Sequence, residues 1–255
     1  MVRLVGTIPR VQALFVNPVI VGGLAVLCRL GVAYRSTQDL DTLLRRFEGQ
    51  PSGLEILERA GATSLDNLGA TLPTERGDVR VDVLEARDSD LDRDFTDRTD
   101  RLEAMAHRWA LATATPVRIG ATSMDERLRG TNASVAENSE PVEVEALVAR
   151  PGPLVAMKLK ASVDRTEAKE ATDLLDVIRL VTDPVSAQQV TEEFRSSDAQ
   201  LADDAWRHAE LKFERRATRT LRLIRNLGRA DVDAELIAAT ADFLRGTMVR
   251  GDSRP

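Results

Sequence analysis

The sequence predicts a mixed α/β domain with a small sheet, followed by a helical domain, and three observations support this. Residues 78–85 alternate apolar and polar side chains, which is typical of a half-buried strand. Residues 19–44 join two further apolar strand patterns through a glycine pair and a short helix pattern. After the Pro-Gly-Pro turn at 151–153, the apolar residues recur at helical spacing. We therefore expect two domains, residues 1–150 and residues 151–255.

The stretch from Val19 to Leu44 organises the first domain. An apolar β-forming run precedes Gly22 and Gly23, and an apolar helix pattern then continues to a stop signal at Gly31. The next apolar run contains the tripeptide from Asp39 to Asp41. We expect a strand, a glycine turn, a helix and a second strand.

The remaining elements follow from local patterns. In the first domain we expect an N-terminal extension at 1–18, a helix at 53–61, a loop at 62–77, a solvated acidic loop at 87–100, a helix at 102–112, strands at 116–119 and 142–148, and a polar loop at 123–141. In the second we expect one helix over 154–181, or two with a capping box from Asp164 to Glu167, then helices at 184–195, 201–227 and 231–248, with stop signals at Gly228 and Gly246.

Composition restricts the classes of function. The chain of 255 residues has 35 basic and 41 acidic residues, a net charge of -6, which argues against broad coating of nucleic acid but leaves room for a local basic groove. The single cysteine, Cys28, excludes a disulfide within one chain and fits a reducing cytoplasm. The apolar run at 11–27 is short and interrupted, so we expect no membrane span.

Asp39 and Asp41 form the candidate metal site. Residues two apart on a strand point to the same face, so the two carboxylates would lie side by side. Neighbouring carboxylates repel each other unless a cation lies between them, and hard oxygen ligands suit Mg²⁺ or Mn²⁺. The backbone at Gly22 and Gly23 could approach a phosphate group closely.

An ordered set of motifs resembles one known family. These motifs are Gly22-Gly23, Arg35-Ser-Thr37-x-Asp39-Leu-Asp41, the strand carboxylate Asp82, Met157-Lys158-Leu159-x-Ala161, and Arg165-x3-Lys169-Glu170-x2-Asp173. Together they resemble the AbiEii-type nucleotidyltransferase toxins of type IV toxin–antitoxin pairs. These toxins, which include the MenT toxins, belong to the DNA polymerase β-like nucleotidyltransferase superfamily. The chain departs from the family in having Gly22-Gly23 for the usual Gly-Ser and Lys169-Glu170 for the usual Lys-Asp.

The resemblance implies a nucleotidyltransferase fold and a role for each matched residue. Asp39, Asp41 and Asp82 would hold Mg²⁺ or Mn²⁺ and, with Lys158 and Asp173, would be the catalytic residues. The nucleotide would be bound by Gly22, Gly23, Arg35, Thr37 and Lys158. Arg165 and Lys169 would contact RNA.

The function implied is that of a cytoplasmic toxin that transfers nucleotides from a nucleoside triphosphate to the 3′ end of tRNA. This would block aminoacylation and growth, and a cognate antitoxin protein would be its partner. Two alternatives stay open, namely an enzyme that nucleotidylates a protein or a small molecule, and a regulator that binds nucleotide without turnover.

Several matched residues also have purely structural interpretations. Asp39 and Asp41 could lie on a solvated edge strand. Asp82 could pair with an arginine across the sheet. Lys158 could be a surface lysine, and Asp173 could be the i, i+4 partner of Lys169.

Overall fold

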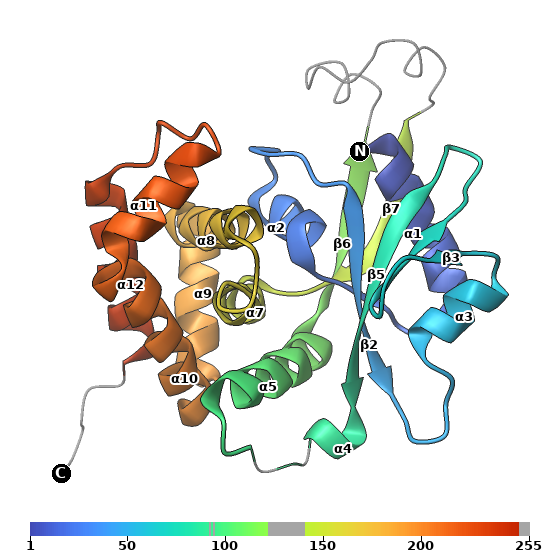
Figure 1. Ribbon diagram of the computed structural model, residues 1–255, viewed down its shortest axis with the longest axis horizontal. Coiled ribbons are helices and arrows are strands. Elements are labelled where there is room, and N and C mark those ends of the chain that lie inside the picture. Colours follow the sequence, from blue (N-terminus) through green and yellow to red (C-terminus); the bar gives the residue numbers. More distant parts are fainter. Residues whose placement is uncertain (92, 94, 122–140, 250–255) are drawn as a thin grey trace. The chain divides into compact units, whose positions relative to one another are not determined.

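The computed structural model describes residues 1–91, 93, 95–121 and 141–249. The chain divides into two compact units (Figure 1). Unit 1 comprises residues 1–92 and 110–150, and unit 2 comprises residues 93–109 and 151–255. The division after Arg150 falls where the sequence predicts a domain boundary, and a segment ahead of it, residues 93–109, joins the helical unit. Residues 123–140 of the expected polar loop lie outside the described residues.

Unit 1 is built on one mixed sheet, with seven strands in the part of the chain that the structure describes. The strands are β1 (Val19–Ile20), β2 (Asp39–Arg46), β3 (Thr63–Ser64), β4 (Gly69–Leu72), β5 (Val79–Arg87), β6 (Thr115–Ala121) and β7 (Val142–Val148). Their order is β3-β4-β5-β2-β1-β7-β6. β2 runs parallel to β5, and β1 runs parallel to β7, while the other neighbours are antiparallel. The mixed α/β class is therefore confirmed.

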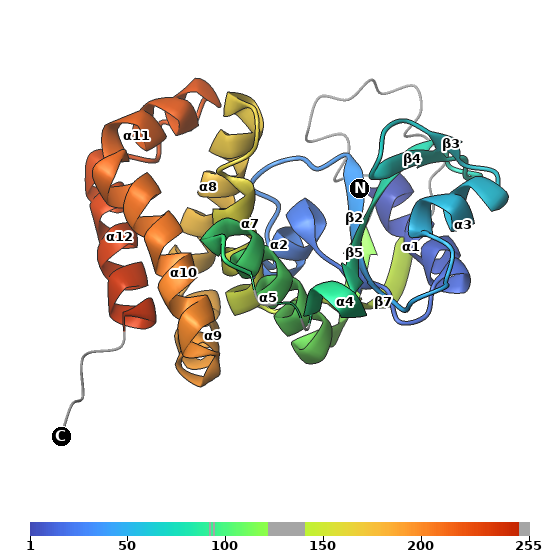
Figure 2. The same ribbon diagram turned by 60° about the horizontal axis from the view of Figure 1, so that its bottom comes forward.

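Helices cover both faces of this sheet (Figure 1). They are α1 (Val2–Leu14), α2 (Gly22–Leu30) and α3 (Gly53–Arg59), while the short α4 (Asp88–Leu91) directly follows the end of β5. Figures 1 and 2 both show α2 on one face, with α1 and α3 on the other. The faces of the central strands differ accordingly, because Val79, Val81 and Val83 of β5 are buried while the alternate residues are partly exposed.

Three expectations for the first domain are wrong, and one of them is the acidic loop at 87–100, which contains α4 (Asp88–Leu91) and the first residues of the helix that begins at Arg98. The N-terminal segment is not an extension but helix α1, because Val2, Val5, Ile8 and Val11 recur at helical spacing and are buried. The segment expected to be a loop at 62–77 contains the antiparallel strands β3 and β4. These strands are two and four residues long, too short to produce a clear alternation.

Unit 2 is helical throughout its described secondary structure. Its elements are α5 (Arg98–Thr113, whose last four residues belong to unit 1), α7 (Pro151–Ala161), α8 (Glu167–Thr182), α9 (Pro184–Ser196), α10 (Ala199–Ala209), the π-helix η1 (Glu210–Arg215), α11 (Ala217–Asn226) and α12 (Ala234–Met248). The expected capping box is wrong, because Thr166 rather than Asp164 is the N-cap of α8. Gly246 does not stop a helix but lies inside α12.

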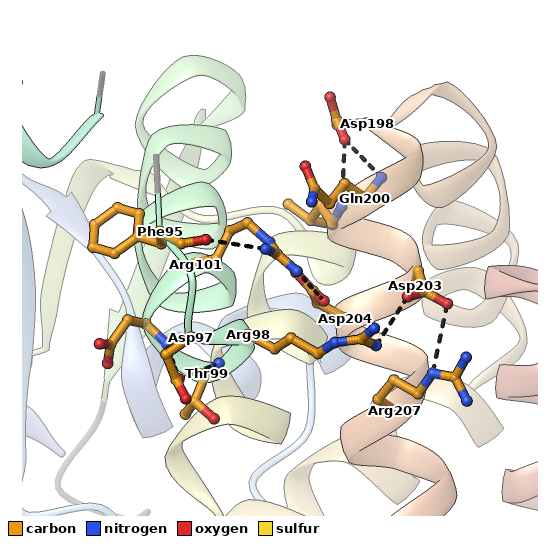
Figure 3. Close-up of polar contacts among 12 residues, drawn as sticks. Phe95, Asp97, Arg98, Thr99, Arg101, Asp198, Gln200, Asp203, Asp204 and Arg207 are labelled. Carbon is orange, nitrogen blue, oxygen red and sulfur yellow. Dashed lines mark hydrogen bonds and ion pairs between the residues drawn. The ribbon is translucent and has the colours of Figure 1, made fainter. Parts of the chain in front are cut away.

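A buried ion pair explains why the segment 93–109 belongs to unit 2. Arg101 of α5 donates two hydrogen bonds to Asp204 of α10, with Nε–Oδ2 at 2.6 Å and Nη2–Oδ1 at 2.8 Å (Figure 3). Asp204 is fully buried, so this two-point pairing compensates a charge that would otherwise be costly. At the exposed side of the same contact, Arg98 pairs with Asp203.

Candidate functional site

Three carboxylates lie on one face of neighbouring strands in unit 1. Asp39 and Asp41 flank the buried Leu40 on β2, so both side chains project to the opposite face from Leu40. The parallel register of β2 and β5 places Asp82 directly opposite Asp41. The three residues that the resemblance implies as metal ligands therefore lie on one face of two neighbouring strands.

Asp41 lies against the backbone of Gly22, at the turn from β1 into α2. Gly22 has a φ of +64°, in the left-handed region that favours glycine. A Cβ atom at this position would lie only 1.9 Å from Oδ2 of Asp41. The glycine is therefore required twice, once by its backbone angle and once by the neighbouring carboxylate.

The second glycine of the pair makes room for Arg35 and Thr37. A Cβ atom on Gly23 would lie 2.6 Å from Nη2 of Arg35 and 2.9 Å from Oγ1 of Thr37. These atoms surround the N-terminus of α2, where no side chain caps the helix. The first amides of a helix lack partners within the helix and can bind an anion. A cation and a hydroxyl beside such amides form a suitable cradle for a phosphate group.

Asp82 forms an ion pair with an arginine, as its structural interpretation proposed, but the partner is on its own strand. Nε of Arg80 donates to Oδ1 of Asp82 at 2.7 Å, and Nη2 of Arg80 lies 2.8 Å from Oδ2 of Asp66. The hydrogen bond to Asp82 raises the pKa of Arg80 above its ordinary value, so the guanidinium stays charged. A Cβ atom on Gly69 of β4 would lie 2.1 Å from Oδ1 of Asp82. Arg80 is thus a member of the site that the sequence analysis missed, although its i, i+2 spacing to Asp82 places both on one face.

The fit of a divalent ion to these carboxylates is incomplete in the arrangement described. Three carboxylates on adjacent strands are the donor type that Mg²⁺ prefers. Among the described residues, however, no group of three or more His, Cys, Asp or Glu side chains converges as a metal site. Asp82 is directed to Arg80, and it would have to exchange this partner for an ion.

Unit 2 holds a second cluster, centred on Lys158 of α7. Its Nζ lies 2.6 Å from Oδ1 of Asp173 and 2.9 Å from Oδ2 of Asp176, both on α8. Lys158 is 8% exposed, Asp173 2% and Asp176 0%. The surface interpretation of Lys158 is therefore wrong, and the partner of Asp173 is Lys158 rather than Lys169. Asp176 was missed, although it follows Asp173 by three residues and shares its helix face.

The two residues expected to contact RNA differ in their surroundings. Arg165 lies in the turn between α7 and α8, with its Nε 3.5 Å from Oδ2 of Asp173. Lys169 is exposed on the first turn of α8. The break between α7 and α8 explains the difference, since on one continuous helix these residues and Lys158 would share a face.

Glu170, which replaces the family's aspartate, is buried in a third cluster. Its Oε1 lies 2.8 Å from Nζ of Lys212 and is also paired with Arg219. Burial acts to raise the pKa of Glu170, but hydrogen bonds from Arg219 and Lys212 outweigh it and hold this pKa below the ordinary value. Nζ of Lys212 also donates to the carbonyl of Ser162, at the end of α7. The π-helix η1 therefore fixes the α7–α8 turn, a link that no local pattern in residues 201–227 revealed.

The expected site residues thus fall into two groups. Unit 1 contains Gly22, Gly23, Arg35, Thr37, Asp39, Asp41 and Asp82, and unit 2 contains Lys158, Arg165, Lys169 and Asp173. Within each unit the structure brings residues from separate segments together. The chemistry available is a carboxylate face beside an anion cradle in unit 1 and a buried lysine with two carboxylates in unit 2.

Comparisons with known proteins identify no relative of this chain. No family model, curated protein or solved structure matches the chain. Within the described residues, no helix combines the length and the apolar character needed to cross a membrane.

Proposed function

We propose that the protein is a metal-dependent nucleotidyltransferase with the nucleotidyltransferase fold, acting as the toxin of a toxin–antitoxin pair. It transfers nucleotides from a nucleoside triphosphate to the 3′ end of tRNA in the cytoplasm, and a cognate antitoxin neutralises it. The observation that carries the proposal is the carboxylate face of Asp39, Asp41 and Asp82 beside the turn at Gly22 and Gly23. The resemblance of the motifs to AbiEii-type toxins supplies the acceptor and the partner.

The residues of unit 1 have distinct tasks in this proposal. The amides at Gly22 and Gly23, with Arg35 and Thr37 beside them, bind the β- and γ-phosphates. Asp39, Asp41 and, after release from Arg80, Asp82 would hold Mg²⁺, which would supply charge neutralisation at the attacking and leaving oxygens. Asp82 would also accept the proton of the attacking 3′-hydroxyl after its hydrogen bond to Arg80 is broken.

The bonds formed and broken in nucleotidyl transfer determine which product carries a radioactive label. The 3′-hydroxyl oxygen forms a bond to the α-phosphorus, the bond from that phosphorus to the bridging oxygen breaks, and pyrophosphate leaves. Label on the α-phosphate therefore appears in the acceptor, whereas label on the γ-phosphate appears in pyrophosphate.

The proposal is tested by substitution of the carboxylates. Asp39→Asn and Asp41→Asn each remove a charged ligand from a normal strand position, so transfer should fall at least a hundredfold while the fold is retained. Asp88→Asn is the matched control, because Asp88 is a partly exposed acidic residue of unit 1 that pairs with Arg45 beyond the end of β5. Near-wild-type transfer by both strand variants would place the reactive centre elsewhere.

A further inference from the structure

The segment from Arg215 to Arg229 stands out by its charge. It contains six arginines, at 215, 216, 219, 222, 225 and 229, and no acidic residue. The chain as a whole has more acidic than basic residues. The segment covers the end of η1, all of α11 and the turn after it.

Helix α11 separates its apolar residues from its arginines. Thr220, Leu223 and Ile224 are buried, and α11 packs against α8, α12 and η1 within unit 2. Arg222 and Arg225 are exposed, and their positions on the helical wheel lie opposite the buried residues. Thr218 and Asn226 are exposed on the same side. We call these four residues the outer face of α11 (Figures 1 and 2 label the helix).

The outer face differs in its pairing from the two lysines of α7, Lys158 and Lys160. Lys158 is enclosed by two carboxylates, and Lys160 pairs with Glu103 and Asp164. By contrast, within the ranges that the structure describes, no carboxylate oxygen lies within 4 Å of the guanidinium groups of Arg222 and Arg225. Their charge is therefore available to an anion from outside.

We propose that the outer face of α11 binds the phosphate backbone of the RNA acceptor. Arginine donates paired hydrogen bonds to phosphate oxygens, and threonine and asparagine side chains are common additional phosphate donors. Arg222 and Arg225 are three residues apart, so their Cβ atoms lie about 5–6 Å from each other and can contact successive phosphates. The choice of RNA as the polyanion rests on the proposed function, while the binding face itself rests on the geometry of α11.

An acidic protein is the competing occupant, and the composition of the face argues against it. The core of a protein–protein interface is apolar and enriched in aromatic side chains. The outer face consists of two arginines, a threonine and an asparagine, with no aromatic residue among them. Such a surface suits a charged, hydrated backbone better than a desolvated protein contact.

The experiment measures binding of bulk tRNA to the full chain at several salt concentrations, by fluorescence anisotropy. The double variant Arg222→Gln/Arg225→Gln removes both cations from exposed positions and should keep the fold. Its dissociation constant should rise about tenfold or more, and the slope of log K against log salt should fall by about two contacts. The control variant, Arg195→Gln/Arg207→Gln, removes two exposed arginines of α9 and α10 and should bind as the wild type does.

The possible outcomes distinguish whether the outer face of α11 binds RNA, binds an acidic protein or binds neither. Wild-type affinity and an unchanged salt slope in the double variant would overturn the proposal. If the wild type bound poly-glutamate as tightly as tRNA, and the double variant lost both equally, the face would belong to an acidic protein instead. If the double variant lost tRNA binding but the wild type transferred no nucleotide, this inference would stand and only the proposed function would be refuted.

Discussion

At the residue scale, Gly22 is the position where a side chain is excluded for two independent reasons. Its positive φ costs a non-glycine residue about 1–2 kcal/mol. A Cβ atom would in addition displace the carboxylate of Asp41. The effect of backbone strain can be separated from the effect of displacing the Asp41 carboxylate, because Gly31 at the other end of α2 has a positive φ but no such contact.

That comparison gives the first prediction. Gly31, at the other end of α2, has a φ of +66°, and among the described residues a Cβ atom added there would meet no neighbouring segment within 4 Å. Gly31→Ala should therefore lose about 1–2 kcal/mol in a urea unfolding experiment and keep nucleotidyl transfer. Gly22→Ala should lose more stability and abolish transfer. Equal behaviour of the two variants in both assays would show that the contact with Asp41 is unimportant.

The sequence predicts on which face of a strand a side chain lies, because apolar and polar residues alternate along the strand. The alternation in 78–85 gives the face of Asp82, and the two-residue spacing gives the common face of Asp39 and Asp41. The partners of these side chains depend on strand pairing and on rotamers, which local patterns do not encode. For this reason Arg80 was not assigned to Asp82 in advance.

At the element scale, the α7–α8 pair depends on a buried cation. Lys158 lies between Asp173 and Asp176 in a region that is almost inaccessible to solvent. Removing one member of a buried ion-pair cluster leaves an uncompensated charge, which costs about 3–5 kcal/mol. The elements carrying these residues are therefore expected to separate readily when the lysine is lost.

The second prediction compares two lysines of the same helix. Lys158→Met should lower the free energy of unfolding by about 3–5 kcal/mol. Lys160→Met should cost roughly 1 kcal/mol or less, because the Lys160 side chain is partly exposed and pairs with exposed carboxylates. Urea unfolding measures both. If Lys158→Met kept wild-type stability but lost transfer, the lysine would act on the triphosphate and not as a structural ion-pair partner.

Elements were predicted well where one face is buried along several turns or residues. The strands β2, β5, β6 and β7 lie where the sequence indicates them, and so do the helices α5 and α9. The sequence analysis does not predict helix α1, although its apolar spacing is regular, because the turn signal at Asn17-Pro18 alone does not indicate a helix before it. The sequence of residues 154–181 is compatible with one continuous helix or with two helices. The contacts of Lys212 with Ser162 and Glu170, which no local pattern encodes, hold the turn between α7 and α8.

At the scale of the whole molecule, the buried His107 makes the stability depend on pH. His107 on α5 is buried, and burial lowers the pKa of its imidazole below the ordinary 6.5, with Glu103 acting to raise it and Lys160 to lower it. The unfolded chain therefore binds this proton at a higher pH than the folded chain does. The free energy of unfolding rises with pH wherever the unfolded state holds more protons. The stability that depends on a neutral His107 is therefore lost as the pH falls below about 6.5.

The third prediction follows from that sign. The wild type should lose stability between pH 7.5 and pH 5.5, and His107→Gln should lose less over the same interval because the titrating group is gone. Urea unfolding at three pH values measures the two slopes. A variant with the same pH dependence as the wild type would show that His107 contributes nothing to it.

The mixed α/β class and the helical character of the second half follow from periodicity, which is a property of whole segments. The assignment of residues 93–109 to the helical unit does not, because it depends on the pairing of Arg101 with Asp204 across about a hundred residues of sequence. The structural role of residues 190–255 could not be predicted from the sequence either, because Lys212 and Arg219 act through ion pairs with the distant Glu170.

The central claim is that this chain moves a nucleotide onto RNA, and the transfer of label tests it most directly. The wild-type protein is incubated with Mg²⁺, total RNA and each α-labelled nucleoside triphosphate in turn, with Asp41→Asn in parallel. We expect label at the 3′ end of tRNA for at least one nucleotide with the wild type, and none with Asp41→Asn. Label in protein or in small molecules, or triphosphate binding without any transfer, would contradict it.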